Sequence, residues 1–224
     1  MKLYSSAPVP VPDWYITDGL LMHLDGINNT GNGHSNSDKT WVDLTGNGHD
    51  VTLTGSPVFG SNYIKPVRRG TSDTGLSRTA YKHVELVFKA TTRSSSAVLH
   101  AQGNNVGTIW LGTGGGFYTA AGNSATYYGK IITLASEEDA QISAISMEVS
   151  RNPSIIYLNG TKVTSDVSST GTWGSNSSTV NWFSYAATTY VFSMPIYSLR
   201  FYDKVLTDAE VLNNWLVDKD RFGL

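Results

Sequence analysis

The chain has no cysteine among its 224 residues. It therefore carries no disulfide, no zinc–thiolate centre and no thiol nucleophile. The lack of disulfides leaves the redox compartment open, because a chain of this length buries roughly 70% of its unfolded surface and needs no covalent cross-link.

Charged side chains are scarce as well, at 15% of the residues, against about 25% in ordinary soluble domains. Ser, Thr, Asn and Gly take their place, so the surface is polar through hydroxyl and amide groups. The net charge is −2, and the nearest thing to a basic run is Arg68-Arg69. This pattern argues against polyanionic partners, and we expect no nucleic-acid binding. Neutral, hydroxyl-rich ligands suit such a surface.

Long hydrophobic runs are also missing. No apolar stretch approaches the roughly 20 residues of a membrane-spanning helix, so we expect no membrane insertion. The N-terminus shows no hydrophobic stretch of signal-peptide length. Export then uses another route, or the chain is a fragment of a larger exported protein, or it belongs to a particle assembled inside a cell. We expect an extracellular, cell-surface or virion location.

Short apolar runs that alternate with turn signals fill most of the chain and predict an all-β protein. In one run, Val84, Leu86 and Phe88 share a single strand face. Asn159-Gly160 predicts a type I′ hairpin, because both central positions need positive φ. Strands are expected over residues 20–24, 41–44, 51–54, 83–90, 97–102, 108–112, 116–120, 127–134, 140–149, 155–158, 161–164, 180–183 and 191–202, with an irregular excursion over 61–81.

The N-terminal residues differ from this pattern. Pro8, Pro10 and Pro12 alternate with valines, which predicts an extended lead-in over residues 1–18. This lead-in either connects to an upstream module or packs as an arm on the domain. Residues 19–224 are expected to form one domain, since all-β sandwiches often reach this size.

One helix is expected near the C-terminus. Thr207 and Glu210 have the spacing of a capping box, and Leu206 and Val211 can form the hydrophobic staple around it. The apolar stripe expected to pack on a sheet consists of Val211, Leu212, Trp215 and Leu216.

Three segments carry a family pattern in order along the chain. They are Trp41-Val42-Asp43-Leu44-Thr45-Gly46-Asn47-Gly48-His49-Asp50, the hairpin Tyr157-Leu158-Asn159-Gly160-Thr161-Lys162-Val163, and the tail from Ile196 to Glu210 with Arg221-Phe222. Together they resemble the laminin-G-like, concanavalin A-like lectin and glucanase domains. The resemblance implies a two-sheet antiparallel jelly-roll sandwich with one short C-terminal helix. Because this fold serves carbohydrate-binding modules, adhesins, phage and bacterial surface proteins and glycoside hydrolases, it does not settle the function.

Catalytic motifs are absent. Laminarinase-type relatives of this fold carry Glu-x-Asp-x-x-Glu on one strand, which aims the acids into one cleft, and the chain lacks this pattern. Glu85 and Glu148 lie on expected strands and could meet across a sheet, but two solvated carboxylates are the favoured interpretation. Gly-x-Ser-x-Gly and His-Glu-x-x-His are missing, and the glycines of residues 112–116 predict a turn rather than a phosphate loop. We therefore expect no enzyme.

Aromatic side chains outside the clean apolar periodicity are candidates for sugar binding, because sugars present apolar C–H faces beside a rim of hydroxyls. The candidate ligand-binding residues are Trp173, Tyr127, Tyr128, Asn123 and Tyr118. Trp173 lies in a polar loop and either tucks into the edge of the core or faces a ligand. Tyr118 and Trp110 lie on expected strands, where core packing is the competing interpretation. Trp41, Trp182 and Trp215 are assigned to the core.

Calcium is the one cofactor that the sequence suggests, and none is required. Asp25, Asp43, Asn47 and Asp50 could supply the oxygen ligands that Ca²⁺ prefers. The same residue types beside glycine also cap backbone amides in turns.

Three functions remain open at this point. The leading hypothesis is a non-catalytic, lectin-like module of a bacterial or phage surface protein, with a glycan or polysaccharide as partner. The second is a structural or protein-interaction module of a phage tail or adhesin, which packs against other subunits or modules. The third is a glycoside hydrolase with a non-standard carboxylate pair.

Overall fold

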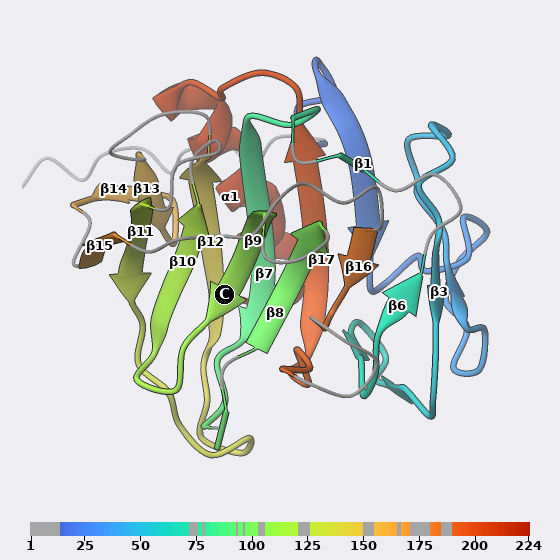
Figure 1. The fold of residues 1–224 in the computed structure, drawn as a ribbon. Helices are drawn as coiled ribbons and strands as arrows, with labels where there is room; N and C mark the ends of the chain where they lie inside the picture. The colour runs from blue at the N-terminus through green and yellow to red at the C-terminus, as the bar shows by residue number, and fades with distance from the viewer. Residues whose placement is uncertain are drawn as a thin grey trace, which may run out of the picture.

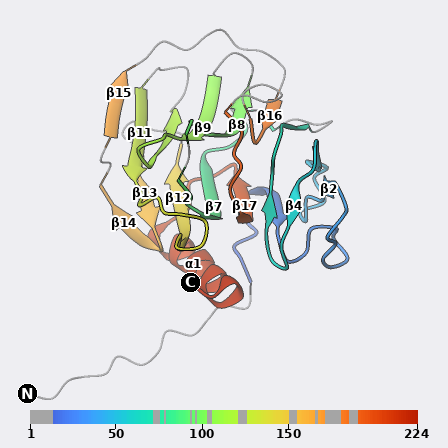
Figure 2. The same cartoon turned by 90° about the horizontal axis from the view of Figure 1, so that it is seen from below.

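Two antiparallel β-sheets pack face to face, and helix α1 (Asp208–Phe222) covers the outer face of the first sheet (Figures 1 and 2). The computed structural model describes residues 14–71, 76–77, 79–92, 94–95, 97–102, 106–120, 126–149, 155–164, 167–170, 180–184 and 190–224. For residues 101–102, 106–108, 119–120, 126–129 and 167–170 it describes the backbone alone. The predicted all-β sandwich with one C-terminal helix is confirmed. No helix in these ranges has the length and hydrophobicity needed to cross a membrane.

The first sheet carries the helix. In spatial order it contains β14 (Thr161–Val163), β13 (Ile156–Leu158), β12 (Ile142–Glu148), β7 (His83–Lys89), β17 (Ile196–Tyr202), β5 (Ile64–Lys65) and β4 (Val58–Phe59), and β1 (Leu20–Asp25) also pairs with β17.

The second sheet lies on the side of the first sheet that faces away from α1 (Figure 2). Its order is β15 (Val167–Thr170), β11 (Thr126–Ile131), β10 (Gly116–Ala120), β9 (Val106–Leu111), β8 (Ala97–Gln102), β16 (Val180–Trp182), β6 (Gly70–Thr71), β3 (Val51–Leu53) and β2 (Thr40–Trp41). The sequence pattern does not predict β4, β5, β6 and β15. These strands have two to four residues, which is too short for a period-2 pattern to stand out.

The alternation in β7 builds the core between the sheets. Val84, Leu86 and Phe88 are fully buried there, and the Phe88 ring lies 5.8 Å from the ring of Phe117 on the second sheet. Trp41 and Trp182 are also fully buried in this core, as predicted.

Helix α1 begins as its sequence predicts. The Thr207 hydroxyl accepts a hydrogen bond from the backbone N–H of Glu210, and the Glu210 carboxylate accepts one from the backbone N–H of Thr207. The helix ends at Gly223, which adopts the left-handed conformation. The predicted capping box is therefore confirmed.

The buried face of α1 differs from the predicted apolar stripe. Leu212 is 42% exposed, whereas Asn214 and Asp218 are buried. Trp215 is only partly buried and packs over the turn at Gly160, where a Cβ in place of the glycine hydrogen would lie 2.2 Å from the indole. The hairpin turn is confirmed, since Asn159 and Gly160 both have positive φ. Two polar residues thus replace apolar ones on the packed side of the helix.

A buried arginine explains these polar positions. Arg200 on β17 is 1% exposed and donates through Nε to Glu85 Oε2 at 2.9 Å. Its two terminal nitrogens donate to the two carboxylate oxygens of Asp218 at 2.9 and 2.6 Å. Asn214 completes the network by donating to Glu85 Oε2 at 2.7 Å. The helix is therefore joined to the sheet by charge-assisted hydrogen bonds as well as by apolar contacts.

The end of the predicted lead-in joins the same network. Tyr15 is buried, its hydroxyl donates to Asp218 at 2.8 Å, and its ring lies 4.0 Å from the Arg200 guanidinium carbon. Arg221 donates to the Tyr15 hydroxyl at 2.9 Å and to Asp25 at 2.6 Å. Tyr15, within the predicted lead-in, thus packs on α1, and residues 1–13 lie outside the described part of the chain.

Candidate functional site

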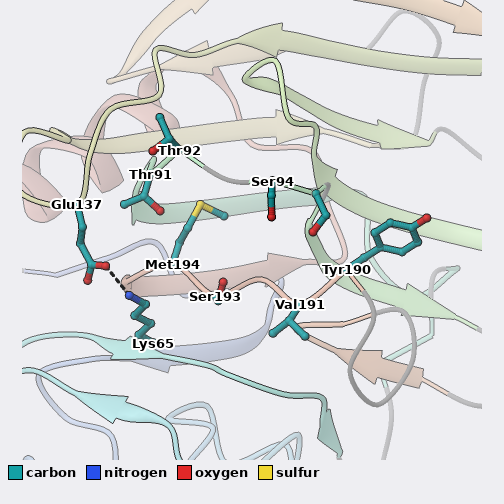
Figure 3. Close-up of a pocket in the computed structure, with 10 residues that line it drawn as sticks. Lys65, Thr91, Thr92, Ser94, Glu137, Tyr190, Val191, Ser193 and Met194 are labelled. Atoms are coloured by element: carbon teal, nitrogen blue, oxygen red, sulfur yellow. Dashed lines mark hydrogen bonds and ion pairs between the residues drawn. The ribbon is translucent and has the colours of Figure 1, made fainter.

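A polar cleft of about 450 Å³ opens where β7 leads toward β8 (Figure 3). Four separate parts of the chain line it: Lys65; Thr91, Thr92, Ser94 and Ser95; Glu137; and Tyr190, Val191, Ser193 and Met194. Its size falls within the range of small-molecule sites, and hydroxyl groups dominate its polar lining. The cleft is therefore the candidate binding site.

Lysine side chains hold one wall of the cleft in place. Lys65, at the end of β5, forms an ion pair with Glu137, and Lys89 donates to the backbone carbonyl of Glu137 at 2.8 Å. The backbone N–H of Thr92 donates to the carbonyl of Ala135 at 2.7 Å. These contacts tie the connection between β11 and β12 to the first sheet, so the polar groups of this wall have fixed positions.

Tyr190 lies at the end of the cleft opposite the Lys65–Glu137 pair (Figure 3). Its side chain is 45% exposed, and its backbone has a φ of 55°. The Tyr190 carbonyl accepts a 2.8 Å hydrogen bond from the backbone N–H of Val98, and Val191 forms a β-bridge with Val98. The second sheet therefore holds a bulky residue in a conformation that costs such residues of order 1–3 kcal/mol.

Two other described residues that are not glycine share this conformation, and both have a structural reason. Asn159 occupies the hairpin turn, which requires positive φ. Phe183 is fully buried, and its ring stacks on Trp41 with centroids 5.9 Å apart. The half-exposed ring of Tyr190 has no comparable burial. Strained backbone conformations cluster at binding and active sites.

The cleft could not be found from the sequence. None of its described lining residues was a candidate, because Ser, Thr and one Lys–Glu pair in loops form no local motif. The only available signal was the general excess of hydroxyl residues over charged ones.

The fold is shared with part of Trypanosoma rangeli sialidase. The structure of that enzyme in complex with 2,3-difluorosialic acid, described as a covalent intermediate, matches with a TM-score of 0.62 and 12% identity over 95% of this chain. Its complex with sialic acid matches with a TM-score of 0.61 and 13% identity over 96% of this chain. This chain spans 36% of the length of either sialidase. At this identity the similarity shows the fold alone.

Other comparisons add little. The carbohydrate-binding module CBM40 of Ruminococcus gnavus IT-sialidase matches with a TM-score of 0.48 and 13% identity, over 67% of this chain and 95% of that one, which is too weak to support an argument. No protein-family model and no curated protein sequence matches the chain.

The predicted aromatic candidates lie away from the cleft or outside the described residues. Trp173 and Asn123 lie outside the residues that the structure describes. The described backbone places Tyr127 and Tyr128 on β11, opposite Ala120 and Thr119. They are therefore not placed together with the cleft residues.

Tyr118 lies on the outer face of the second sheet. It is paired in register with Trp110, and their ring centroids are 5.3 Å apart. Both are partly buried and neither joins the core, which contains the alternate residues Phe117 and Ile109. The competing prediction of core packing for Tyr118 and Trp110 is thus wrong, because strand alternation points them to the other face.

The glycine run next to Tyr118 is a turn, as predicted. The backbone N–H of Gly112 donates to the carbonyl of Gly116 at 2.8 Å. A Cβ at Gly116 would lie 2.2 Å from the Tyr118 hydroxyl, so the tyrosine ring needs glycine beneath it. This turn therefore supports a side chain and does not bind phosphate through a helix N-terminus.

The calcium candidates take part in hydrogen bonds to the backbone. Asp43 accepts from the backbone N–H groups of His23 at 3.0 Å and His49 at 3.2 Å, and Asp50 accepts from that of Asp43 at 2.8 Å. Asn47 donates to a carbonyl of β1, and Asp25 is paired with Arg221. Across the described ranges, no three His, Cys, Asp or Glu side chains come together in a metal-ligating group. These contacts favour the turn-capping interpretation of these residues over a calcium site.

We expect calcium to leave the melting temperature unchanged, because Asp25, Asp43 and Asp50 already accept hydrogen bonds from backbone amides. A site with a Kd one hundredfold below the calcium concentration would instead add about 2.7 kcal/mol and raise the melting temperature by several degrees. Thermal unfolding with calcium chloride and with EDTA measures the difference. A clear rise in the melting temperature with calcium, but not with magnesium, would show that the protein has a calcium site.

Glu85 and Glu148 are not the solvated pair that the sequence favoured. They are 4% and 5% exposed, and they lie diagonally on adjacent strands, since Glu85 is opposite Ser146 and Glu148 is opposite His83. Burial raises the pKa of Glu85, while Arg200 and Asn214 act in the opposite direction. The prediction of solvent exposure is wrong because α1 covers this face of the sheet.

The arrangement around Glu85 does not resemble a glycosidase site. Asn214 and Arg200 occupy its carboxylate, and the cavity that it lines with Trp215 measures about 10 Å³. This volume accommodates about one water molecule. A sugar ring does not fit there.

His83 and Ser146 form a buried contact that could be mistaken for a catalytic dyad. His83 Nε2 lies 2.6 Å from Ser146 Oγ, and the backbone N–H of Leu206 donates to His83 Nδ1 at 3.4 Å. Because Nδ1 accepts, the ring proton lies on Nε2, which then donates to the serine. Burial also lowers the pKa of His83 to about 3. In this tautomer the histidine cannot remove the serine proton, so the pair is structural.

Proposed function

We propose that this protein is a non-catalytic carbohydrate-binding module and that the cleft at Tyr190 is its binding site. The observation that carries the proposal is the position of Tyr190 at the end of a cleft lined with hydroxyl groups. Its backbone has positive φ, and its ring is half-exposed. A pyranose presents a flat C–H face, which packs on an aromatic ring, and hydroxyls, which exchange hydrogen bonds with polar side chains.

The polar lining suits such a ligand. Serine and threonine hydroxyls both donate and accept, so they match sugar hydroxyls in either role. Ser94 and Ser193 lie between Tyr190 and the charged pair in Figure 3, and Thr91 lies beside that pair. A sugar stacked on Tyr190 would thus face hydroxyl partners on the rest of the cleft.

The comparisons support a glycan as the partner. The sialidases of similar fold are described in complex with sialic acid and a difluoro derivative, although this chain spans only about a third of their length. The proposed setting is a bacterial or phage surface protein of the concanavalin A-like type, acting outside the cell or on a virion, with no cofactor.

We expect Tyr190→Ala to weaken glycan binding about tenfold or more, because it removes the stacking surface. Tyr190→Phe keeps the ring and should retain most of the affinity. Tyr190→Gly removes both ring and strain, so its free energy of unfolding should stay within about 1 kcal/mol of the wild type while binding is lost. A glycan array identifies the ligand, and calorimetry with that glycan measures each variant.

Tyr118→Ala is the matched control, because it removes a partly buried tyrosine from the outer face of the second sheet. It should leave the affinity unchanged. If Tyr118→Ala abolishes binding and Tyr190→Ala does not, the ligand binds the outer face and the cleft is the wrong site.

Absence of catalysis is part of the proposal. The purified protein should release no reducing sugar from a broad polysaccharide panel, because the Glu85 carboxylate is occupied by Arg200 and Asn214. Release that disappears in Glu85→Gln would establish a hydrolase instead.

A further inference from the structure

We infer that the cleft selects uncharged glycans, and that the Lys65–Glu137 ion pair sets this selectivity. The inference rests on the proposed carbohydrate-binding function and adds the class of sugar. It concerns the end of the cleft opposite Tyr190, where the two charged side chains lie (Figure 3).

The described lining of the cleft has no net charge. Its only ionic groups are the Lys65 ammonium and the Glu137 carboxylate, which pair with each other. The side chains are 22% and 50% exposed, so a ligand can reach both. Lys89 fixes the backbone of Glu137 through its carbonyl, which keeps the carboxylate at the cleft when a ligand enters.

The Lys65–Glu137 pair disfavours the binding of an acidic sugar. The Lys65 charge is already compensated, so a sugar carboxylate gains little attraction and is repelled by Glu137. Binding would require the existing pair to separate, and the displaced carboxylate would lose its partner.

A neutral sugar can use the pair without breaking it. Lys65 donates to Oε2 of Glu137, and an ionised carboxylate offers about four acceptor positions in all. Sugar hydroxyls can therefore donate to Glu137 and accept from Lys65 while the two side chains remain paired. Charge-assisted hydrogen bonds of this kind are stronger than neutral ones.

The test compares lactose with 3′-sialyllactose, which differ by one acidic sugar, together with other matched neutral and acidic pairs on a glycan array. We expect the wild-type protein to bind the neutral member of each bound pair at least about tenfold more tightly. Glu137→Gln leaves the Lys65 charge uncompensated, and should reduce this ratio or reverse it. The affinity of Glu137→Gln for acidic glycans should fall with added salt, whereas wild-type affinity for neutral glycans should not.

Two variants control for other effects of the substitution. The double variant Lys65→Gln, Glu137→Gln removes both charges, so neither the repulsion by Glu137 nor an uncompensated Lys65 charge remains, and the preference for neutral glycans should shrink without reversing. Arg93 follows Thr92 in the sequence and lies outside the described residues. Arg93→Gln should leave the ratio unchanged within about threefold, and a larger change would overturn the assignment to the Lys65–Glu137 pair.

The outcomes separate the inference from the proposed function. Equal or tighter wild-type binding of acidic glycans overturns the inference and leaves carbohydrate binding in place. A neutral preference that Glu137→Gln does not change overturns the role of the pair. Failure to bind any glycan, neutral or acidic, overturns the proposed function and the inference with it.

Discussion

Arg200→Met is expected to lower the free energy of unfolding by about 3–5 kcal/mol. The substitution keeps an unbranched, apolar side-chain stem but removes the guanidinium that pairs with Glu85 and Asp218. Both carboxylates are at most 4% exposed, so neither gains water when its partner is lost. Since whole domains are stable by only about 5–15 kcal/mol, this change removes a large share of the total. Urea unfolding followed by tryptophan fluorescence measures it.

Lys204→Met is the matched control, because Lys204 also pairs with two carboxylates. Its partners are Asp18, whose side chain is 82% exposed, and Glu210 at 22%. Pairs near the surface contribute little, so we expect a much smaller loss than in Arg200→Met. Equal losses in the free energy of unfolding for Lys204→Met and Arg200→Met would show that the buried Arg200 network stabilises the fold no more than a surface pair does.

Stability is expected to fall by about 4 kcal/mol when the pH drops from 7 to 5. Burial lowers the pKa of His23 and of His83 to about 3, with Arg200 adding to the effect at His23. In the unfolded chain both histidines titrate near pH 6.5. Between these values His23 and His83 together bind two more protons in the unfolded state than in the folded state, so they remove about 3 kcal/mol for each pH unit below 6.5. Unfolding free energies at several pH values give the slope.

Single substitutions assign this slope to particular histidines. In His83→Gln the amide can replace the hydrogen bonds to Ser146 and Leu206, but it does not titrate. The pH dependence of the free energy of unfolding should therefore correspond to about one proton fewer than in the wild type. A slope that is the same in His83→Gln and the wild type would contradict the assignment.

Local patterns in the sequence were sufficient for several elements of the fold. The start of α1 depends on Thr207 and Glu210, which are three residues apart and bond to each other's backbone. The hairpin turn depends on two neighbouring residues with positive φ, and the β7 core face depends on strand alternation. Each of these features is decided within a few residues, so their chemistry is visible before the chain is folded.

The features that only the tertiary structure decided join residues far apart in the chain. Arg200 and Glu85 are 115 positions apart in the chain, so no local pattern shows that they form an ion pair. For this reason the sequence analysis predicted a solvent-exposed Glu85 and an incorrect buried face for α1. Lys65 meets Glu137 across 72 positions, and Tyr190 adopts positive φ because Val98 of the second sheet holds its backbone. Strand register and sheet packing determine which of these groups meet. A cleft built from such pairs has no local pattern, because no single segment contains enough of it to be recognised.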